Sequence, residues 1–303
     1  MMKNSLYMLL TLFSLSLFGS DPGHNLSLGL PSNNGQVVNR LGYAFSYSEK
    51  HEQPLWIMYE LTKKEVLTKV AKRRDNFRKD PLVKTGSALL TDYKGSGYDR
   101  GHLAPAADMA WSVEAMSESF FLSNMSPQNP SLNRGLWAQL ESKCRDWAVA
   151  NDSVYIITGP VIRPNYSFIG PNKVTVPQWY YKICVSVKKQ QAIAFLIPNS
   201  KPQKKLSEFV VSIDKLEEAT GLDFLDKLPK KVESKIEAHS DIAQWNMAKG
   251  NSIKKTKEVL GAGSFWISSN SQKRHNSSCR WFKKSKGKLG LKSTGVACKI
   301  CGG

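Results

Sequence analysis

The sequence lacks an apolar run long enough to cross a bilayer. Its longest apolar segment, Leu6 to Phe18 behind Lys3, falls short of the roughly 20 residues that a membrane-spanning helix needs. A short apolar segment behind a basic residue is typical of a secretory signal peptide. We therefore expect residues 1–20 to be a cleaved signal peptide and the mature chain to be secreted or periplasmic, without stable membrane association. An uncleaved membrane anchor is the alternative.

Acidic residues are also scarce. The 303 residues include 25 Asp and Glu against 43 Lys and Arg, which gives a formal charge of +18. This excess favours an anionic partner such as nucleic acid, although charge alone does not identify the partner. With 41% apolar and 22% charged residues, the composition excludes a disordered, collagen-like or fibrous protein.

Apolar periodicity predicts a strand-rich domain. Residues 55–61 alternate in the period-two pattern of a strand, and residues 43–47 are its expected hairpin partner. Segments rich in β-branched and aromatic residues predict further strands over 153–158, 179–187 and 191–197.

Two segments carry helical signals. An apolar stripe from Trp137 to Trp147 lies at helical spacing, on a helix that we expect to begin near Asn133. A shorter helix is predicted from about Ser212 to Gly221, with serine as the N-cap and glycine as the stop. Helices placed among antiparallel strands indicate an α+β fold.

Composition also divides the chain. Residues 239–262 are polar, with GNSIKKTKE at their centre, and predict a linker. We therefore expect one domain over residues 21–238 and a small second domain over residues 263–303, where three of the five cysteines lie.

A glycine-punctuated segment, Gly95 to Met109, carries the residues of most chemical interest. It places Asp99, Arg100 and His102 close together, in a polar stretch that can hold an imidazole where substrate reaches it. The alternative is an ordinary surface loop whose histidine caps a neighbouring group.

A second segment, Phe120 to Glu141, contains Asn124, Asn133 and Glu141. Asn133 and Glu141 are eight residues apart, which is about 80° around an α-helix, so both side chains can face one site. The alternative roles are an N-terminal cap and a solvated glutamate.

The motifs DRGH, SNMSPQ and LNRGLWAQLE, at residues 99–102, 123–128 and 132–141, have the order and spacing of a known family. The sequence resembles the DNA/RNA non-specific endonucleases, the ββα-metal nucleases that include mitochondrial endonuclease G and secreted bacterial nucleases. The resemblance extends from about Leu41 to Leu228. It implies a ββα-metal nuclease fold, in which helices flank a central antiparallel sheet.

The resemblance also implies roles for individual residues. His102 would be the general base that takes a proton from the attacking water. We expect its pKa to lie near the free-histidine value of ~6.5. Asn133 would be the direct protein ligand of Mg²⁺, or of Mn²⁺ as the alternative ion, and Glu141 would hold that ion through a water molecule.

The remaining implied roles concern the phosphate and the metal shell. Arg100 and Arg73 would clamp the scissile phosphate, with Arg74 as the alternative to Arg73. Asn124 would support the metal shell.

These residue types suit phosphodiester hydrolysis, and none of them reads a base. We therefore expect an endonuclease that hydrolyses DNA and RNA with little sequence preference. Two alternatives remain open: a catalytically silent nucleic-acid-binding protein that kept the fold, and a phosphodiesterase that acts on small nucleotides. The sequence does not distinguish a homodimer from a monomer. The lysine clusters at 201–205 and 227–231 are interpreted as solvated faces.

The C-terminal segment has the spacing of a metal site. His275, Cys279, Cys298 and Cys301 follow the pattern H-x3-C-x18-C-x2-C, which suits a closed tetrahedral Zn²⁺ site. So small a unit needs such a site in order to fold. The alternative is disulfide bonding, which leaves one cysteine over and gives His275 no role.

Two further features stay open. Residues 280–288, RWFKKSKGK, interleave aromatic and basic side chains, which suits either nucleic-acid binding or a solvated hairpin. Cys144 and Cys184 are expected to be core thiols, with a disulfide as the alternative.

Overall fold

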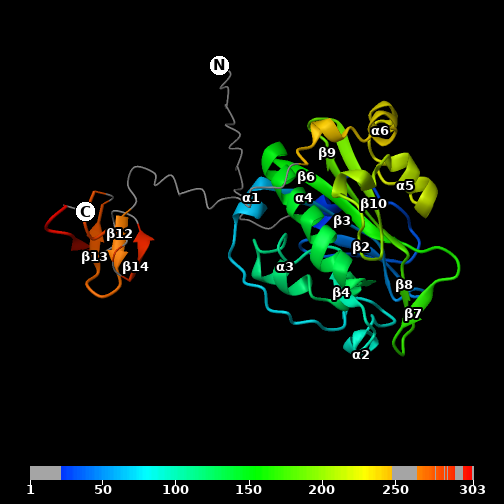
Figure 1. Cartoon of the computed structure of the whole chain (residues 1–303), viewed down its shortest axis with the longest axis horizontal. Coiled ribbons are helices and arrows are strands. Elements are labelled where there is room, and N and C mark those ends of the chain that lie inside the picture. Colours follow the sequence, from blue (N-terminus) through cyan, green and yellow to red (C-terminus); the bar gives the residue numbers. More distant parts are fainter. Residues whose placement is uncertain are drawn as a thin grey trace, which may run out of the picture. The chain divides into compact units, whose positions relative to one another are not determined.

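The computed structural model describes residues 22–247 and, towards the C-terminus, residues 265–276, 278–282, 284, 286–290 and 296–301. The chain divides into two compact units, Met1–Ala248 and Lys249–Gly303, which are described separately (Figure 1). The expected signal peptide and most of the expected linker lie outside the described residues. Among the helices that are described, none combines the length and apolar character that crossing a membrane requires.

An antiparallel sheet of seven strands organises the first unit. Its strand order is β1-β2-β3-β6-β9-β10-β11. The strands are β1 (Gln36–Asn39), β2 (Ala44–Ser48), β3 (Gln53–Thr62), β6 (Ser153–Val161), β9 (Trp179–Ser186), β10 (Gln191–Pro198) and β11 (Val210–Val211). The four longest correspond to the predicted strands, and β2 is the hairpin partner expected for β3. These predictions are confirmed.

Helices cover both faces of this sheet (Figure 1). On one face, the long helix α4 (Ala138–Asn151) shares a buried cluster with Tyr59 of β3. On the other face, α5 (Ile213–Thr220) and α6 (Lys230–Glu237) share a second cluster with Trp56. Because successive side chains of a strand point to opposite faces, both sides of β3 are buried. The α+β fold expected from the sequence is confirmed.

The helical signal near Asn133 begins with an unusual segment. Residues Leu132–Trp137 form the π-helical segment η3, and α4 follows directly. Such segments are rare and occur frequently at functional sites. The angle of about 80° expected between Asn133 and Glu141 assumed α-helical winding throughout, so it does not hold across η3.

Helix α5 has the ends that the sequence predicted. The Ser212 hydroxyl accepts a hydrogen bond from the Lys215 backbone amide at 3.2 Å. Gly221 ends the helix with a φ of 71°, in the left-handed region that glycine adopts without strain. The remaining short helices are η1 (Pro22–Leu26), α1 (Lys63–Leu67), α2 (Leu90–Tyr93), α3 (Val113–Glu118), η2 (Leu122–Asn124), η4 (Leu206–Phe209) and η5 (Ile242–Gln244).

Two short antiparallel ribbons complete the first unit. One pairs β4 (Asp99–His102) with β5 (Met125–Gln128), and the other pairs β7 (Ser167–Ile169) with β8 (Val174–Val176). The DRGH motif is therefore a strand rather than the surface loop of the alternative interpretation. Its Gly101 lies where a Cβ atom would collide with the Gln128 side chain, so only glycine permits this close pairing.

Residues 239–247 differ from the expected linker. Trp245 is 2% exposed, and its ring meets that of Trp147 edge to face at 5.0 Å. The Trp147 indole also donates to the Asn246 carbonyl oxygen at 3.3 Å. This stretch therefore packs on the first unit, because its tryptophan fills a place beside α4.

The second unit contains a small sheet of its own. Its strand order is β14-β12-β13-β15, in which β13 and β15 are parallel and the other pairs are antiparallel. The strands are β12 (Phe265–Ser268), β13 (Lys273–His275), β14 (Gly287–Gly290) and β15 (Val296–Ala297).

Candidate active site

The β4–β5 ribbon positions the histidine of the DRGH motif. Arg100 and His102 are two residues apart on β4, so their side chains leave the same face of the strand. His102 pairs with Met125 of β5, and its carbonyl oxygen accepts a hydrogen bond of 3.4 Å from the Trp137 indole. The ribbon is thereby held against η3, which completes the ββα arrangement.

His102 lies in a largely apolar surrounding and is 9% exposed. Its ring lies 5.6 Å from that of Phe77 and 5.1 Å from that of Phe120, measured between centroids. The Nε2 atom is buried and has no hydrogen-bond partner among the described residues. Burial and then the positive charges of Arg73 and Arg100 lower the pKa of His102 to about 3. The imidazole is therefore neutral near pH 7, as a general base must be, and the expected value near ~6.5 does not hold.

Aromatic rings hold the two arginines beside this histidine. The Arg100 guanidinium lies 4.3 Å from the centre of the Phe77 ring, and that of Arg73 lies 5.1 Å from the Phe120 ring. Arg73 also donates to the Asp75 carboxylate at 2.7 Å. Arg74 lines a different cavity, beside Val113 and Met116. The structure thus brings Arg73, rather than Arg74, to His102.

Asp99 orients the proposed metal ligand. The Asn133 side-chain amide donates to Asp99 Oδ2 at 2.8 Å, which turns its carbonyl oxygen away from the carboxylate. Arg134 donates to both oxygens of Asp99, at 2.8 and 2.6 Å. Partial burial opposes ionisation, but the hydrogen bonds from Arg134 and Asn133 lower the pKa of Asp99. The sequence analysis did not assign this role, although Asp99 stands in the DRGH motif.

An open cavity of about 410 Å³ joins these groups. It is lined by Arg73, Asp75, Phe77, Leu90, Asp99, Arg100, Asn133 and Arg134. His102 contacts this lining through the Phe77 ring. The cavity therefore combines guanidinium groups and an amide oxygen, which suit a phosphate and a hard cation, and the neutral imidazole lies behind its Phe77 wall.

Glu141 lies in the first turn of α4, the helix that follows η3 directly. Burial raises the pKa of Glu141 to about 7, and the negative charge of Asp108 adds to this shift. The positive charges of Lys182, Arg145 and Arg73 oppose it. A positive ion beside the carboxylate would lower its pKa again.

Buried charged residues affect the pKa of Glu141, and sequence reasoning missed them. Lys182 is 1% exposed and donates to the Leu103 carbonyl oxygen at 3.3 Å. Asp108 receives Arg145 at 2.8 Å and the Tyr59 hydroxyl at 2.8 Å. The available signals were a lone lysine inside an apolar strand and an arginine one helical turn beyond Glu141.

Asn124 has a different role from the one expected. It is 0% exposed, and its Oδ1 accepts from the Ala104 backbone amide at 2.9 Å. Its Nδ2 donates to the carbonyl oxygens of Ala104 and Ser119, each at 2.8 Å. Because its amide is engaged with the backbone, Asn124 fastens the segment after His102 rather than supporting a metal.

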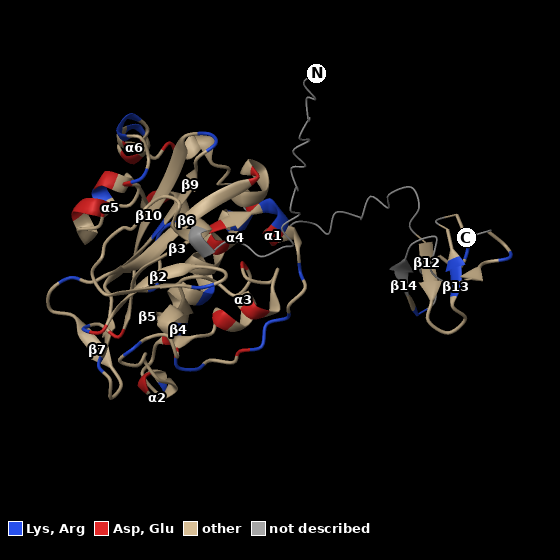
Figure 2. Ribbon diagram, turned by 180° about the vertical axis from the view of Figure 1, so that it is seen from behind, with Lys and Arg blue, Asp and Glu red and all other residues tan. Residues whose placement is uncertain are grey.

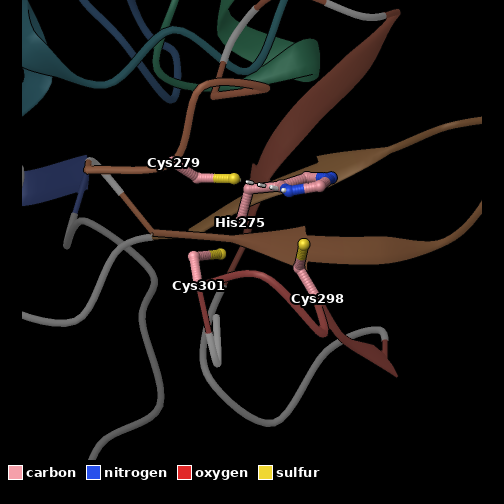
Figure 3. A group of neighbouring side chains, drawn as sticks. All are labelled: His275, Cys279, Cys298 and Cys301. Carbon is pink, nitrogen blue, oxygen red and sulfur yellow. Dashed lines mark hydrogen bonds between the residues drawn. The ribbon is translucent and has the colours of Figure 1, made fainter.

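The second unit brings together the four residues of its Cys/His pattern. The ligand atoms of His275, Cys279, Cys298 and Cys301 all lie within 4.8 Å of one another, and the side chains converge (Figure 3). His275 Nδ1 and Cys279 Sγ are 3.2 Å apart. Three thiols and an imidazole at this spacing are the donor set of a tetrahedral zinc site.

The structure also shows part of the basic aromatic segment and the two remaining cysteines. Trp281 is 46% exposed, with the Arg280 guanidinium 5.2 Å from its ring centre. Cys144 and Cys184 are buried free thiols whose sulfur atoms lie 3.0 Å apart.

Comparisons with known proteins show the family of this chain. Residues 21–231 match the family model of the DNA/RNA non-specific endonucleases. The mitochondrial nuclease of Saccharomyces cerevisiae is 35% identical over 70% of this chain and 72% of its own length. Human endonuclease G, a mitochondrial protein, is 33% identical over 68% of this chain and 74% of its own length. The crystal structure of an EndoG/EndoGI complex aligns with a TM-score of 0.63 and 31% identity, over 69% of this chain and 93% of that one.

These relatives also correct one expectation. The yeast and human nucleases are mitochondrial, so the prediction of a secreted or periplasmic location is wrong. The N-terminal pattern misled because a short apolar segment behind a basic residue does not by itself specify a compartment. The resemblance to the nuclease family and the expected fold are confirmed. The chain belongs to the DNA/RNA non-specific endonuclease family and is a nuclease, a hydrolase of phosphodiester bonds.

Proposed function

We propose that this nuclease uses Mg²⁺ to cleave both DNA and RNA, with His102 as its general base. One observation carries the proposal: a buried imidazole with an unpartnered Nε2 atom, flanked by the guanidinium groups of Arg73 and Arg100. A neutral imidazole can accept a proton from water, and guanidinium groups bind phosphate oxygens.

Each residue then has one task. His102 takes a proton from the attacking water, while Arg73 and Arg100 bind the non-bridging oxygens of the scissile phosphate. Asn133 holds Mg²⁺, or Mn²⁺ in its place, through its amide oxygen, and Glu141 holds the ion through water. When bound, the ion neutralises charge on the phosphate and on the leaving oxygen. All of these contacts are to phosphate, water or metal, so cleavage should have little sequence preference.

A plasmid-nicking assay tests this proposal. His102→Ala should lower the rate about 100- to 10,000-fold and leave DNA binding nearly intact, because a general base contributes that much. His239→Ala, at an exposed histidine, is the matched control and should keep the wild-type rate. Activity of His102→Ala within about tenfold of wild type would contradict the assignment.

A DNA-binding measurement and turnover assays on dinucleotides and long polymers separate the alternative functions. Wild-type protein that binds DNA but does not cut it with Mg²⁺ or Mn²⁺ would be a silent binding protein. Faster turnover of dinucleotides than of long DNA or RNA would indicate a phosphodiesterase of small nucleotides.

We also propose that the C-terminal unit, residues 263–303, is a zinc-binding domain held by His275, Cys279, Cys298 and Cys301. We place the end of the nuclease domain at residue 247 rather than 238, because Trp245 packs beside α4. Purified protein should contain about one Zn²⁺ per chain, as one tetrahedral site requires. A chain ending at Met247 should contain none and still cut DNA. Disulfide-linked cysteines without zinc would contradict the zinc site and leave the nuclease proposal standing.

A further inference from the structure

Five carboxylates converge between α5 and α6, on the sheet face opposite α4. Figure 1 shows the two helices side by side, and Figure 2 shows acidic residues on both. Two triads of carboxylates each have oxygen atoms within 4.8 Å of one another, and Glu237 belongs to both. The first triad adds Asp214 and Glu217, and the second adds Asp223 and Glu233. We call these five residues the carboxylate cluster.

The local sequence explains this convergence. Asp214 and Glu217 are three residues apart on α5, and Glu233 and Glu237 are four apart on α6, so each pair shares a helix face. Apolar residues of the same helices, Ile213 and Ile236, lie in the buried core beneath. The apolar contacts therefore bring the acidic faces together, although like charges at these spacings repel.

Two members of the cluster are buried without enough partners. Glu233 is 4% exposed and Glu237 is 7% exposed. Lys230 reaches one oxygen of Glu233 at 2.7 Å. The second oxygen of Glu233 and the Oε1 atom of Glu237 have no hydrogen-bond partner in the part of the chain that the structure describes. A buried carboxylate oxygen without a partner is costly, so the site requires a further positive group.

The neighbouring carboxylates increase the need for a positive group at this site. Burial, followed by the charges of Glu217, Glu233, Asp214 and Asp223, raises the pKa of Glu237 to about 7. One proton on Glu237 would still leave four carboxylates close together, with Lys230 bonded to Glu233 and the Phe224 backbone amide bonded to Glu217. A divalent cation would instead satisfy oxygens from both helices at once.

We propose that the carboxylate cluster binds one Ca²⁺ ion that ties α5 to α6. Calcium takes six to eight oxygen ligands in flexible geometry and accepts bidentate carboxylates, whereas Mg²⁺ demands a regular octahedron and keeps several waters. We place the ion beside Glu237, because this residue belongs to both triads. The site is structural and separate from the active site, because α5 and α6 pack on the other face of the sheet.

Calorimetric titration of the full-length, calcium-free protein with CaCl₂ tests this proposal. Wild type should bind one Ca²⁺ per chain, and Glu237→Gln should weaken that binding at least ~10-fold, because it removes the shared ligand. Glu49→Gln, at an exposed glutamate outside the cluster, should bind as wild type does. If Glu237→Gln does not fold, Asp214→Asn removes an exposed ligand instead and should also weaken binding.

A second variant tests whether the calcium site is separate from the proposed catalytic metal site. Asn133→Ala should bind Ca²⁺ as wild type does, and Glu237→Gln should keep the wild-type nicking rate at saturating Mg²⁺. The proposal is overturned by wild type that binds no Ca²⁺, by Glu237→Gln with unchanged affinity, or by loss of the ion in Asn133→Ala.

Discussion

The nicking rate at saturating Mg²⁺ should change little as the pH falls from about 8 to about 5.5. A histidine with a pKa near ~6.5 would be only about one-tenth neutral at pH ~5.5, which predicts a rate loss of about tenfold. His102 has a pKa lowered to about 3, first by burial and then by Arg73 and Arg100. With such a pKa, more than ~99% of the base remains neutral at pH ~5.5.

The perturbation that tests this cause is Arg73→Gln. Removing one of the two positive charges should raise the pKa of His102, so the acidic fall in rate should begin at a higher pH than in wild type. Initial rates on supercoiled plasmid give this profile, and an NMR titration of the His102 ring gives the pKa directly.

Magnesium must saturate the enzyme at each pH. Burial raises the pKa of Glu141 to about 7, so acidification protonates this carboxylate and increases the Mg²⁺ concentration required. A wild-type rate that falls about tenfold with a midpoint near pH ~6.5, with Mg²⁺ saturating throughout, would refute the reasoning about His102.

Three further predictions concern metal demand and stability. Asn133→Ala should raise the Mg²⁺ concentration needed for half-maximal rate, measured by Mg²⁺ titration; an unchanged value would argue against a metal ligand. Asp80→Asn breaks the buried pair with Arg40 and should lower the free energy of unfolding by about 3–5 kcal/mol in urea, whereas Asp152→Asn, at an exposed pair with Lys188, should cost much less. The pKa of His102 is lower in the folded state than in the unfolded state. Below pH ~6.5 the unfolded chain therefore binds more protons than the folded one, and acidification lowers the free energy of unfolding. Wild type should therefore lose ~2 kcal/mol more than His102→Gln between pH ~7 and ~5, and equal losses in urea denaturation would contradict the pKa.

Local sequence predicted the elements whose signals are local. The strands β3, β6, β9 and β10 and both ends of α5 follow from side-chain alternation, an N-cap serine and a C-terminal glycine. The start of α4 was less predictable, because no residue pattern distinguished the π-helical segment η3 from the α-helix that follows it.

The sequence identified most residues of the candidate site, but it did not predict their burial or their partners. The motifs singled out His102, Arg100 and Asn133; in the structure Arg100 and Asn133 line one cavity, and His102 packs against its Phe77 wall. The role of Asp99 and the presence of Lys182 were missed because their partners come from other elements, η3 for Asp99 and the segment after β4 for Lys182.

The sequence by itself determined the chemical inventory of this protein: an arginine, a histidine and an asparagine in motif order, four soft ligands at zinc spacing, and the periodicities of the main strands. Only the tertiary structure decided which side chains meet and in what charge state. It selected Arg73 over Arg74, engaged Asn124 with the backbone, and gathered five carboxylates between α5 and α6. The physical reason is that desolvation and Coulomb interactions depend on distances through space, which join residues far apart along the chain.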